Sequence, residues 1–268
     1  MEVEKFPILR VTEQGRSKFE DTVTAEFPLT IILNNRELAT LLCSPTKLKY
    51  LAVGFLFSED LIKSKDEIRE IILDNGRGIV QVTTKEAGEL ARDISFGRLI
   101  ASGGGKGTNF YSTVNGTSQA KVKSRLEVLA PEVFALMVEF VKRSKVFKAT
   151  GGVHSAALCD AKSIIIFSED IGRHNAIDKI FGECILKDIP MNDRIILTSG
   201  RVSLEILLKV AKRNIPILIS KSAPTNLGVK LAADLGITLI GFVRGKSMNV
   251  YTNGWRVVPK LKVEARGI

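Results

Sequence analysis

Four short runs of hydroxyl, glycine and cationic residues in the second half of the chain have the composition of a ligand site. They are Ser168–Asn175, Thr198–Arg201, Ser220–Thr225 and Gly241–Lys246, and each follows a predicted strand. Arginine and lysine side chains supply charge-assisted donors, and the start of a helix presents free backbone N–H groups that bind phosphate. These runs predict a pocket for a phosphate-bearing ligand, centred on the first two of them.

Particular residues within these runs carry the prediction. Gly172 and Gly200 allow a ligand to approach the backbone closely. The cationic donors are Arg173, Arg201, Lys221, Arg244 and Lys246. Helix capping and surface solvation are the alternative explanation for the hydroxyls of Thr225 and Ser199.

The chain has two histidines, and both lie beside these runs. His174 comes one turn into a predicted helix, between Arg173 and Asn175. His154 follows a pair of glycines at the start of a predicted strand. Both side chains titrate near neutrality when unperturbed, so they are candidates for proton transfer. A structural hydrogen-bonding role stays open for each.

The three cysteines, Cys43, Cys159 and Cys184, show no spacing typical of a metal or redox site. With only two histidines beside them, they predict no zinc site. Cys159 lies inside a predicted strand and Cys184 on the apolar face of a predicted helix. We therefore expect these two thiols to be buried packing residues, and a hydrophobic pocket is the simplest expectation for Cys43.

Overall charge favours anionic partners. The 268 residues include 39 Lys and Arg against 29 Asp and Glu, which gives a net charge of +10. The basic residues are spread along the chain, so a small polyanionic ligand is favoured over nucleic acid. The sequence has neither a signal peptide nor an apolar run that could span a membrane, and it predicts a cytoplasmic protein without membrane contact.

The first half of the chain predicts a small α/β unit. Alternating β-branched residues predict strands over 22–33, closed by a turn at 34–37. Apolar residues at helical spacing predict a helix over 46–59, and two further strands are expected at 68–73 and 79–83. A glycine-rich run, Ser102–Thr108, then breaks the pattern. It is either a functional lid or a flexible linker.

The second half alternates more regularly. We expect helices over 131–145 and 173–186, with strands at 153–159 and 163–167 between them. The expected order then continues as strand 194–198, helix 202–213, strand 216–220, helix 226–235 and strand 238–243. The last three strands are continuous apolar runs, which is typical of a sheet covered by helices on both faces. Ligands of such sheets bind beyond the carboxyl ends of the strands, where the polar runs lie.

Several of these motifs together resemble the FdhD/NarQ family, the accessory sulfurtransferases required for active formate dehydrogenase. The match extends in order over nearly the whole chain. It rests on Asp21–Asn34, Leu51–Glu59, Thr150–Ala157, Glu169–Lys179, Ser199–Arg201, Ala223–Thr225 and Gly241–Arg244. The stretch Gly172-Arg173-His174-Asn175 is the most specific of them.

The resemblance implies a fold, a substrate and partners. The expected fold is α/β: a cytidine-deaminase-like three-layer domain over 113–268 and a smaller N-terminal α/β domain over 1–112, ending in the glycine-rich loop. The implied substrate is the bis-molybdopterin guanine dinucleotide form of the molybdenum cofactor, with GDP as its mimic. The implied partners are a cysteine desulfurase, formate dehydrogenase and a second copy of the chain.

The resemblance also implies the site residues. The expected catalytic ones are His154 and His174. The expected cofactor-binding residues are Gly172, Arg173, Asn175, Ser199, Gly200, Arg201, Lys221, Ser222, Phe242, Val243, Arg244, Gly245, Lys246 and Ser247.

The sequence departs from the family in the glycine-rich loop. Family members carry one or two cysteines there, and a persulfide on that cysteine passes sulfur to the molybdenum cofactor. Here the matching positions are Gly104 and Gly107. Two functions therefore stay open: a sulfur carrier or sulfurtransferase, and a cofactor-binding chaperone without thiol chemistry. RNA binding, a third hypothesis, rests on net charge alone. The helix starts lack cysteine, so a zinc deaminase is not expected.

Overall fold

The computed structural model describes residues 2–85, 98–100 and 120–259, and these form two compact units. The first unit consists of 1–112, 144–155 and 168–189, and the second of 113–143, 156–167 and 190–268. The sequence reading placed 144–155 and 168–189 in a continuous C-terminal domain. In the structure these segments belong to the first unit instead, because the helix within 168–189 packs against a helix of the first half of the chain.

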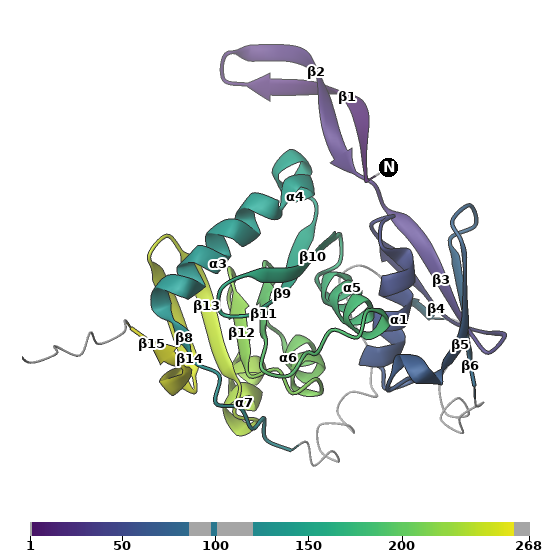
Figure 1. Ribbon diagram of the computed structural model, residues 1–268. Coiled ribbons are helices and arrows are strands. Elements are labelled where there is room, and N and C mark those ends of the chain that lie inside the picture. Colours follow the sequence, from purple (N-terminus) through teal and green to yellow (C-terminus); the bar gives the residue numbers. More distant parts are fainter. Residues whose placement is uncertain (1, 86–97, 101–119, 260–268) are drawn as a thin grey trace, which may run out of the picture. The chain divides into compact units, whose positions relative to one another are not determined.

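A mixed sheet in the first unit has the strand order β5-β6-β3-β4-β7 (Figure 1). Its strands are β3 (Phe27–Leu33), β4 (Arg36–Cys43), β5 (Ile68–Asp74), β6 (Ile79–Thr84) and β7 (Arg98–Ile100). The expected strands at 68–73 and 79–83 and the turn after Leu33 are confirmed. Asn34 and Asn35 both adopt positive φ, as a tight hairpin turn requires. Strand β4, which directly follows this turn, was not predicted.

Two helices of the first unit cross at glycines. Helix α1 (Leu48–Ser58) and helix α5 (Arg173–Leu186) have the expected positions. A Cβ atom on Gly54 would lie 1.7 Å from the carbonyl oxygen of Asp178, and one on Gly182 would lie 1.9 Å from that of Tyr50. The absence of side chains at both positions lets the two backbones touch. Because α5 covers it, almost every residue of α1 is buried.

A hairpin of two long strands begins the chain. Strand β1 (Val3–Thr12) pairs with β2 (Gly15–Thr24) in a sheet of its own. Strand β1 was not predicted, because its polar and apolar residues do not alternate cleanly. Helix α4 (Lys145–Thr150) lies against β2. The expected helix over 131–145 stops at Arg143, because Ser144 leaves the helical conformation, and α4 follows as a separate short helix.

A six-stranded sheet has the order β10-β9-β11-β12-β13-β14, and its centre lies in the second unit. Strands β11 (Ile195–Thr198), β12 (Ile217–Ser220) and β13 (Thr238–Arg244) are parallel to one another, as expected. Strand β9 (His154–Cys159) runs antiparallel to β11, and its neighbour β10 spans Ile164–Asp170. Strand β14 (Ser247–Thr252), which pairs antiparallel with β13, was not predicted.

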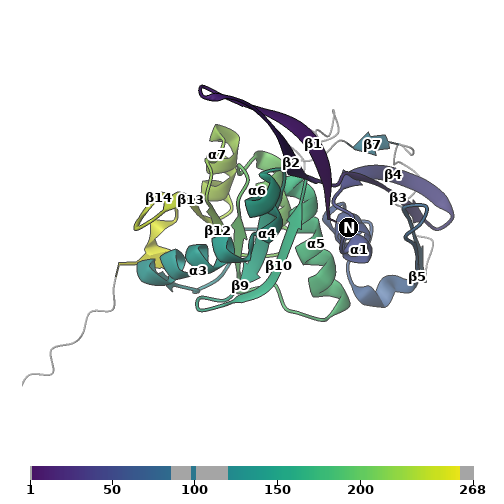
Figure 2. The same ribbon diagram turned by 90° about the horizontal axis from the view of Figure 1, so that it is seen from above.

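Helices cover both faces of this sheet (Figure 2). Helix α3 (Ala130–Arg143) contributes Val133, Leu136 and Phe140 to a core shared with the apolar side chains of β9, β11, β12 and β13. Helix α6 (Leu204–Ala211) packs with α7 (Asn226–Asp234), and α7 contacts β13 and β14. This arrangement explains why the central strands are apolar throughout.

The start of α6 differs from the prediction. The helix begins at Leu204, after an N-cap at Ser203, and not at Val202. Val202 instead forms an isolated bridge with Pro224, which holds it in extended conformation. The run Thr198–Arg201 is therefore a connection between strand and helix. In α7, by contrast, the predicted N-cap is confirmed, since Thr225 Oγ1 accepts the N–H of Gly228.

Short elements complete the structure. These are the 3-10 helices η1 (Lys65–Glu67) and η3 (Gly254–Arg256), and the paired strands β8 (Val128–Leu129) and β15 (Val257–Val258). Within the described residues, no helix has both the length and the apolar character to span a membrane.

Candidate ligand-binding site

Three of the polar runs meet at one edge of the sheet in the second unit. Because β11, β12 and β13 are parallel, their carboxyl ends lie side by side, with Thr198 opposite Ser220. The connections after β11 and β12 contain the predicted residues Ser199, Gly200, Arg201, Lys221 and Ser222. Of the others, Phe242, Val243 and Arg244 end β13, Gly245 and Lys246 form the turn after it, and Ser247 begins β14. The sequence-based expectation that these runs converge is therefore correct for the second unit.

Hydrogen bonds link the first two connections. Buried Ser220 donates its hydroxyl to the carbonyl of Gly200 over 2.8 Å and accepts the N–H of Ser222 over 2.9 Å. The N–H of Lys221 donates to the carbonyl of Thr198 over 3.1 Å. The Ser220 hydroxyl therefore fixes the backbone of both connections.

The end of β13 is joined to the same group. The N–H of Phe242 donates to the carbonyl of Ser222 over 3.1 Å. Gly241 is held so closely that an added Cβ would lie 3.0 Å from the ring of Tyr251 and 3.1 Å from the Ser222 carbonyl. Phe242 itself has a φ of 52°, a conformation that costs energy for an aromatic residue and that the surrounding contacts must enforce.

This strained residue presents a flat aromatic surface beside positive charge. The Phe242 ring is 37 % exposed, and the guanidinium of Arg244 lies 5.7 Å from its centroid. Arg244, Gly245, Lys246 and Ser247 are all exposed, whereas Val243 is buried in the core. Arg201 is exposed at the neighbouring connection. An aromatic face with nearby guanidinium and ammonium groups is suited to an anion that carries a flat ring.

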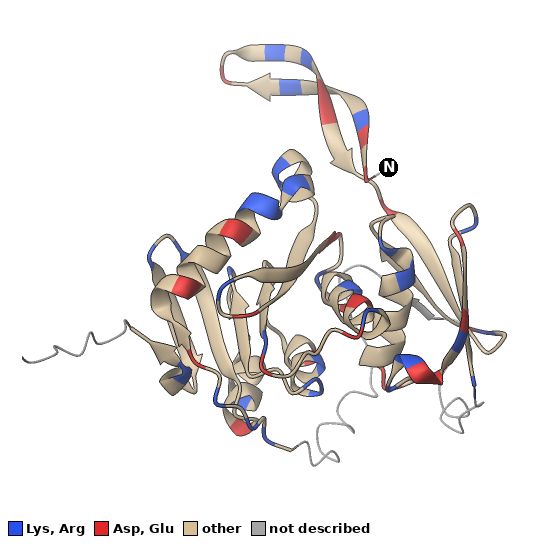
Figure 3. Cartoon of the chain, in the orientation of Figure 1, with Lys and Arg blue, Asp and Glu red and all other residues tan. Residues whose placement is uncertain are grey.

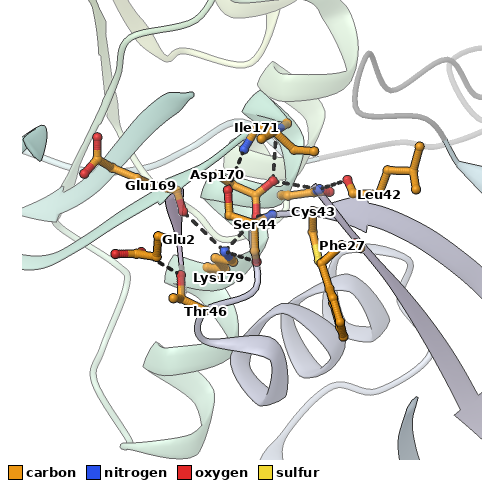
Figure 4. Close-up of polar contacts among 12 residues, drawn as sticks. Glu2, Phe27, Leu42, Cys43, Ser44, Thr46, Glu169, Asp170, Ile171 and Lys179 are labelled. Carbon is orange, nitrogen blue, oxygen red and sulfur yellow. Dashed lines mark hydrogen bonds and ion pairs between the residues drawn. The ribbon is translucent and has the colours of Figure 1, made fainter. Parts of the chain in front are cut away.

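Gly172 and Asn175 belong to the first unit, where both contact a member of a buried ion pair. Figure 4 shows this pair, formed by Asp170 and Lys179. Lys179 Nζ lies 2.7 Å from Asp170 Oδ2, and both side chains are fully buried. The ammonium group also donates to the carbonyls of Ser44 and Glu169, at 3.2 and 3.3 Å. The Asp170 carboxylate accepts the N–H groups of Ser44 and Gly172, at 3.0 and 2.8 Å. Every charged atom of this pair thus has partners, as burial requires.

Asn175 belongs to the same network. Its side-chain amide donates to Asp170 Oδ1 over 3.0 Å and to the carbonyl of Leu42 over 2.9 Å. Gly172, the N-cap of α5, is held by Asp170 as well. A carboxylate of the protein therefore lies at the start of α5, in the place that the sequence reading gave to a phosphate. These contacts show Gly172 and Asn175 fixing the loop that precedes α5.

Arg173 and His174 form the first turn of α5. His174 is buried, with 8 % of its surface exposed, and Arg173 is half-buried. His154, the first residue of β9, is also half-buried in the first unit. Glu169, which shortly precedes α5 in the chain, accepts the N–H groups of Val146 and Phe147, at 3.1 and 2.9 Å, and so anchors α4.

All three thiols are buried, as the sequence indicated. Burial raises the pKa of Cys43 to about 12, and the negative charge of Asp170 adds to this effect. Cys43 Sγ lies 3.4 Å from the carbonyl of Phe27, to which the thiol donates. Burial also raises the pKa of Cys159. A thiol with a raised pKa is a weak nucleophile at neutral pH. The expected persulfide positions, Gly104 and Gly107, lie outside the described residues.

The sequence does not predict the Asp170–Lys179 ion pair or the contacts of Ser44 with it. A signal for Lys179 was present: it lies three residues after Ala176 and next to Ile180, two residues of the helix that the sequence predicts to be buried. A lysine in such a position requires a buried anion. No sequence pattern, however, could connect it to Ser44, which is 135 residues away.

Comparisons with known proteins give the family. The FdhD/NarQ family model matches residues 24–258. The sulfur carrier protein FdhD of Bacillus pumilus is 44% identical over 88% of this chain and 90% of its own length, and that of Bacillus subtilis is 43% identical over 91% and 94%. A crystal structure of a formate dehydrogenase accessory protein from Desulfotalea psychrophila aligns with a TM-score of 0.78 at 26% identity, over 96% of this chain and 99% of that one. The chain belongs to the FdhD/NarQ family.

Proposed function

We propose that the protein is a sulfur carrier that serves the maturation of formate dehydrogenase. The observation that carries this proposal is the similarity to proteins named sulfur carrier protein FdhD, at 38–44% identity over 88–94% of the chain. The similarity to a formate dehydrogenase accessory protein supports the same enzyme as the beneficiary.

These relatives favour a sulfur carrier over a cofactor chaperone without thiol chemistry. Sulfur transfer requires an acceptor thiolate that attacks the terminal sulfur of a desulfurase persulfide, so that a new S–S bond forms and the desulfurase thiolate leaves. The chain offers Cys43, Cys159 and Cys184 for this step, all of them buried. Opening of the structure around one of these thiols is therefore part of the proposal.

The substrate proposed for the second unit is the bis-guanine-dinucleotide molybdenum cofactor. The exposed ring of Phe242 would meet a guanine base, and Arg201, Arg244 and Lys246 would meet its phosphates. Lys221 and Ser222 lie half-exposed between them. The carboxyl edge of parallel strands is where ligands of such sheets bind, which supports this placement. GDP is the corresponding probe. Arg173, His174 and His154 remain proposed functional residues of the first unit.

The proposal includes a cysteine desulfurase as sulfur donor and a homodimeric protein. It also includes a cytidine-deaminase-like fold for the second unit, supported by parallel central strands between helical layers. The proposed sulfurtransferase activity would use the thiol exchange described above, in which a cysteine of this chain accepts sulfur from the desulfurase persulfide.

Persulfide loading tests the function. The protein is incubated with a cysteine desulfurase and cysteine, and its mass is measured before and after reduction. We expect a gain of one sulfur atom that a reductant removes, and three variants with one cysteine each will locate it. A variant with serine at all three positions is the control. A wild-type protein that gains no sulfur but still binds GDP would refute the sulfur carrier and leave the chaperone.

A further inference from the structure

The β1–β2 hairpin exposes far more apolar surface than a solvated arm needs. Phe6, Leu9, Val11, Phe19 and Val23 are between 41 % and 62 % exposed. Isolated two-stranded hairpins are only marginally stable in water, so strands of ten residues gain from a further partner. In Figure 3, positively and negatively charged residues are distributed along both strands of the hairpin.

The pairing register shows which backbone groups point outward. Ala25 N–H donates to the carbonyl of Glu2 over 2.9 Å, so Glu2 and Ala25 form a hydrogen-bonded pair one step beyond Val3 and Thr24. Hydrogen-bonded and non-hydrogen-bonded pairs alternate along an antiparallel ladder. Val3, Lys5, Pro7 and Leu9 are consequently non-hydrogen-bonded, and so are their partners on β2. The backbone groups of these residues face away from the hairpin.

The two outer edges of the hairpin differ. Pro7 occupies an outward position on β1, and it has no N–H group to offer there. This proline protects the β1 edge against strand addition. The outward residues of β2 are Arg16, Lys18, Glu20 and Thr22, and none of them is proline. Residues 15–20 are all exposed, while helix α4 lies against β2 and an added Cβ on Gly152 would touch Thr24 at its base. The open edge is therefore that of β2.

We propose that this edge pairs antiparallel with the β2 edge of a second copy of the chain, with Phe19 on the two-fold axis. In this register Lys18 lies opposite Glu20 of the second copy, and Glu20 opposite its Lys18. Arg16 lies opposite Thr22, and Ser17 opposite Asp21. The outward-facing even-numbered residues then make the hydrogen-bonded pairs, and the two Phe19 side chains meet at a non-hydrogen-bonded pair, where side chains are closest.

Self-complementarity is the reason to choose a second copy over a peptide from another protein. A two-fold interface must match its own surface, and the sequence Lys18-Phe19-Glu20 reverses its charge about the central phenylalanine. The aromatic ring is also prepared for this contact. Phe19 pairs with Ile8 on one face of the hairpin, and the guanidinium of Arg10 lies 3.7 Å from its ring centroid. Pairing would extend this apolar stripe across four strands.

Charge reversal tests the register. This inference rests on the proposed homodimer and names its interface. The mass of the full-length protein is measured by light scattering over a range of concentrations. We expect Lys18→Glu to place glutamates opposite each other twice and to raise the dimer dissociation constant about tenfold or more. The double variant Lys18→Glu, Glu20→Lys restores opposite charges and should recover the dimer. It replaces the exposed Lys5–Glu20 ion pair by two exposed lysines, a change with little effect because both side chains are solvated.

Cross-linking tests the axis independently. At a non-hydrogen-bonded pair the two Cα atoms lie about 4.5 Å apart, within the range of disulfides. Oxidised Phe19→Cys should therefore form a covalent dimer rapidly, whereas Phe6→Cys, exposed on the same face but on β1, should not. A wild-type monomer overturns both the dimer and this interface, whether or not the edge takes up a peptide. A dimer in which neither Lys18→Glu nor Phe19→Cys has an effect overturns the interface alone.

Discussion

Replacing Lys179 by methionine removes the ammonium group from the buried pair and leaves Asp170 without a counter-ion. Loss of one partner of a buried ion pair costs about 3–5 kcal/mol, because the other charge stays buried. Asp170 keeps three donors in the variant, from Ser44, Gly172 and Asn175. We therefore expect a loss near the lower end, about 3 kcal/mol of the free energy of unfolding. Asp170→Asn should cost more, about 5 kcal/mol, since the new amide group would direct its own N–H donors toward the N–H donors that the carboxylate accepts.

Denaturant unfolding followed by far-ultraviolet circular dichroism measures both variants, and hydrogen exchange of α5 reports the local effect. The single tryptophan, Trp255, lies in the second unit and does not report on this pair directly. Lys187→Met is the matched control. Lys187 pairs with Glu183 over 2.6 Å, but its side chain is half exposed, so its loss should cost far less than the loss of Lys179.

The double variant Asp170→Asn, Lys179→Met completes a thermodynamic cycle. If the two groups stabilise each other, its cost is smaller than the sum of the two single costs. A Lys179→Met variant as stable as Lys187→Met would refute the reasoning, because it would mean that Asp170 is satisfied without its counter-ion.

Three further predictions concern other parts of the chain. Gly54→Ala should destabilise the protein by about 3 kcal/mol or more, because its Cβ would overlap the Asp178 carbonyl, even though alanine favours helix. Gly254→Ala is the control and should have little effect, since the nearest atom is 3.5 Å away. Equal unfolding midpoints for the two variants would contradict this prediction. Burial alone would raise the pKa of Glu183, but hydrogen bonds from Lys187 and Lys47 lower it below the ordinary 4.5. Its charge therefore stabilises the fold above pH 4.5, and this contribution disappears as the pH falls through the lowered pKa. The stability difference between wild type and Glu183→Gln should close over that range, and a constant difference would exclude the linkage. Arg201→Ala and Arg244→Ala should each weaken GDP binding by about 1–3 kcal/mol in calorimetry, whereas Arg194→Ala, before the amino end of β11, should not; unchanged affinity in both would remove the proposed site.

Local patterns predicted most elements of the fold. Helix α5 was expected at 173–186 and has these bounds, because its apolar residues recur at helical spacing. Strands β11 to β13 were recognisable as continuous apolar runs between helices. Where a residue is held by a distant segment, prediction failed. Val202 looks like a helical residue, and only its bridge to Pro224 keeps it extended.

The candidate site likewise has features that the sequence predicts and features that depend on distant contacts. The convergence of the connections after β11, β12 and β13 was predictable, since parallel strands bring their carboxyl ends to one edge. The strained backbone of Phe242 was not, because it depends on the register shift between β13 and β14. Asn175 was expected to contact a ligand, but its amide is engaged by Leu42 and Asp170. Asp170 lies just five residues before Asn175, but Leu42 belongs to a strand far away in sequence.

The discontinuity of the first unit affects how the protein is made. Helix α1 leaves the ribosome long before α5, which buries it and which completes the unit at Ile189. Until then, the side of α1 that contacts α5, including the backbone around Gly54, has no native cover. Nascent chains shorter than this should expose a helix that chaperones can bind. A fragment that ends at Ser112 should not fold, and productive folding of the first unit must wait until the segments 113–143 and 156–167 of the second have already been synthesised.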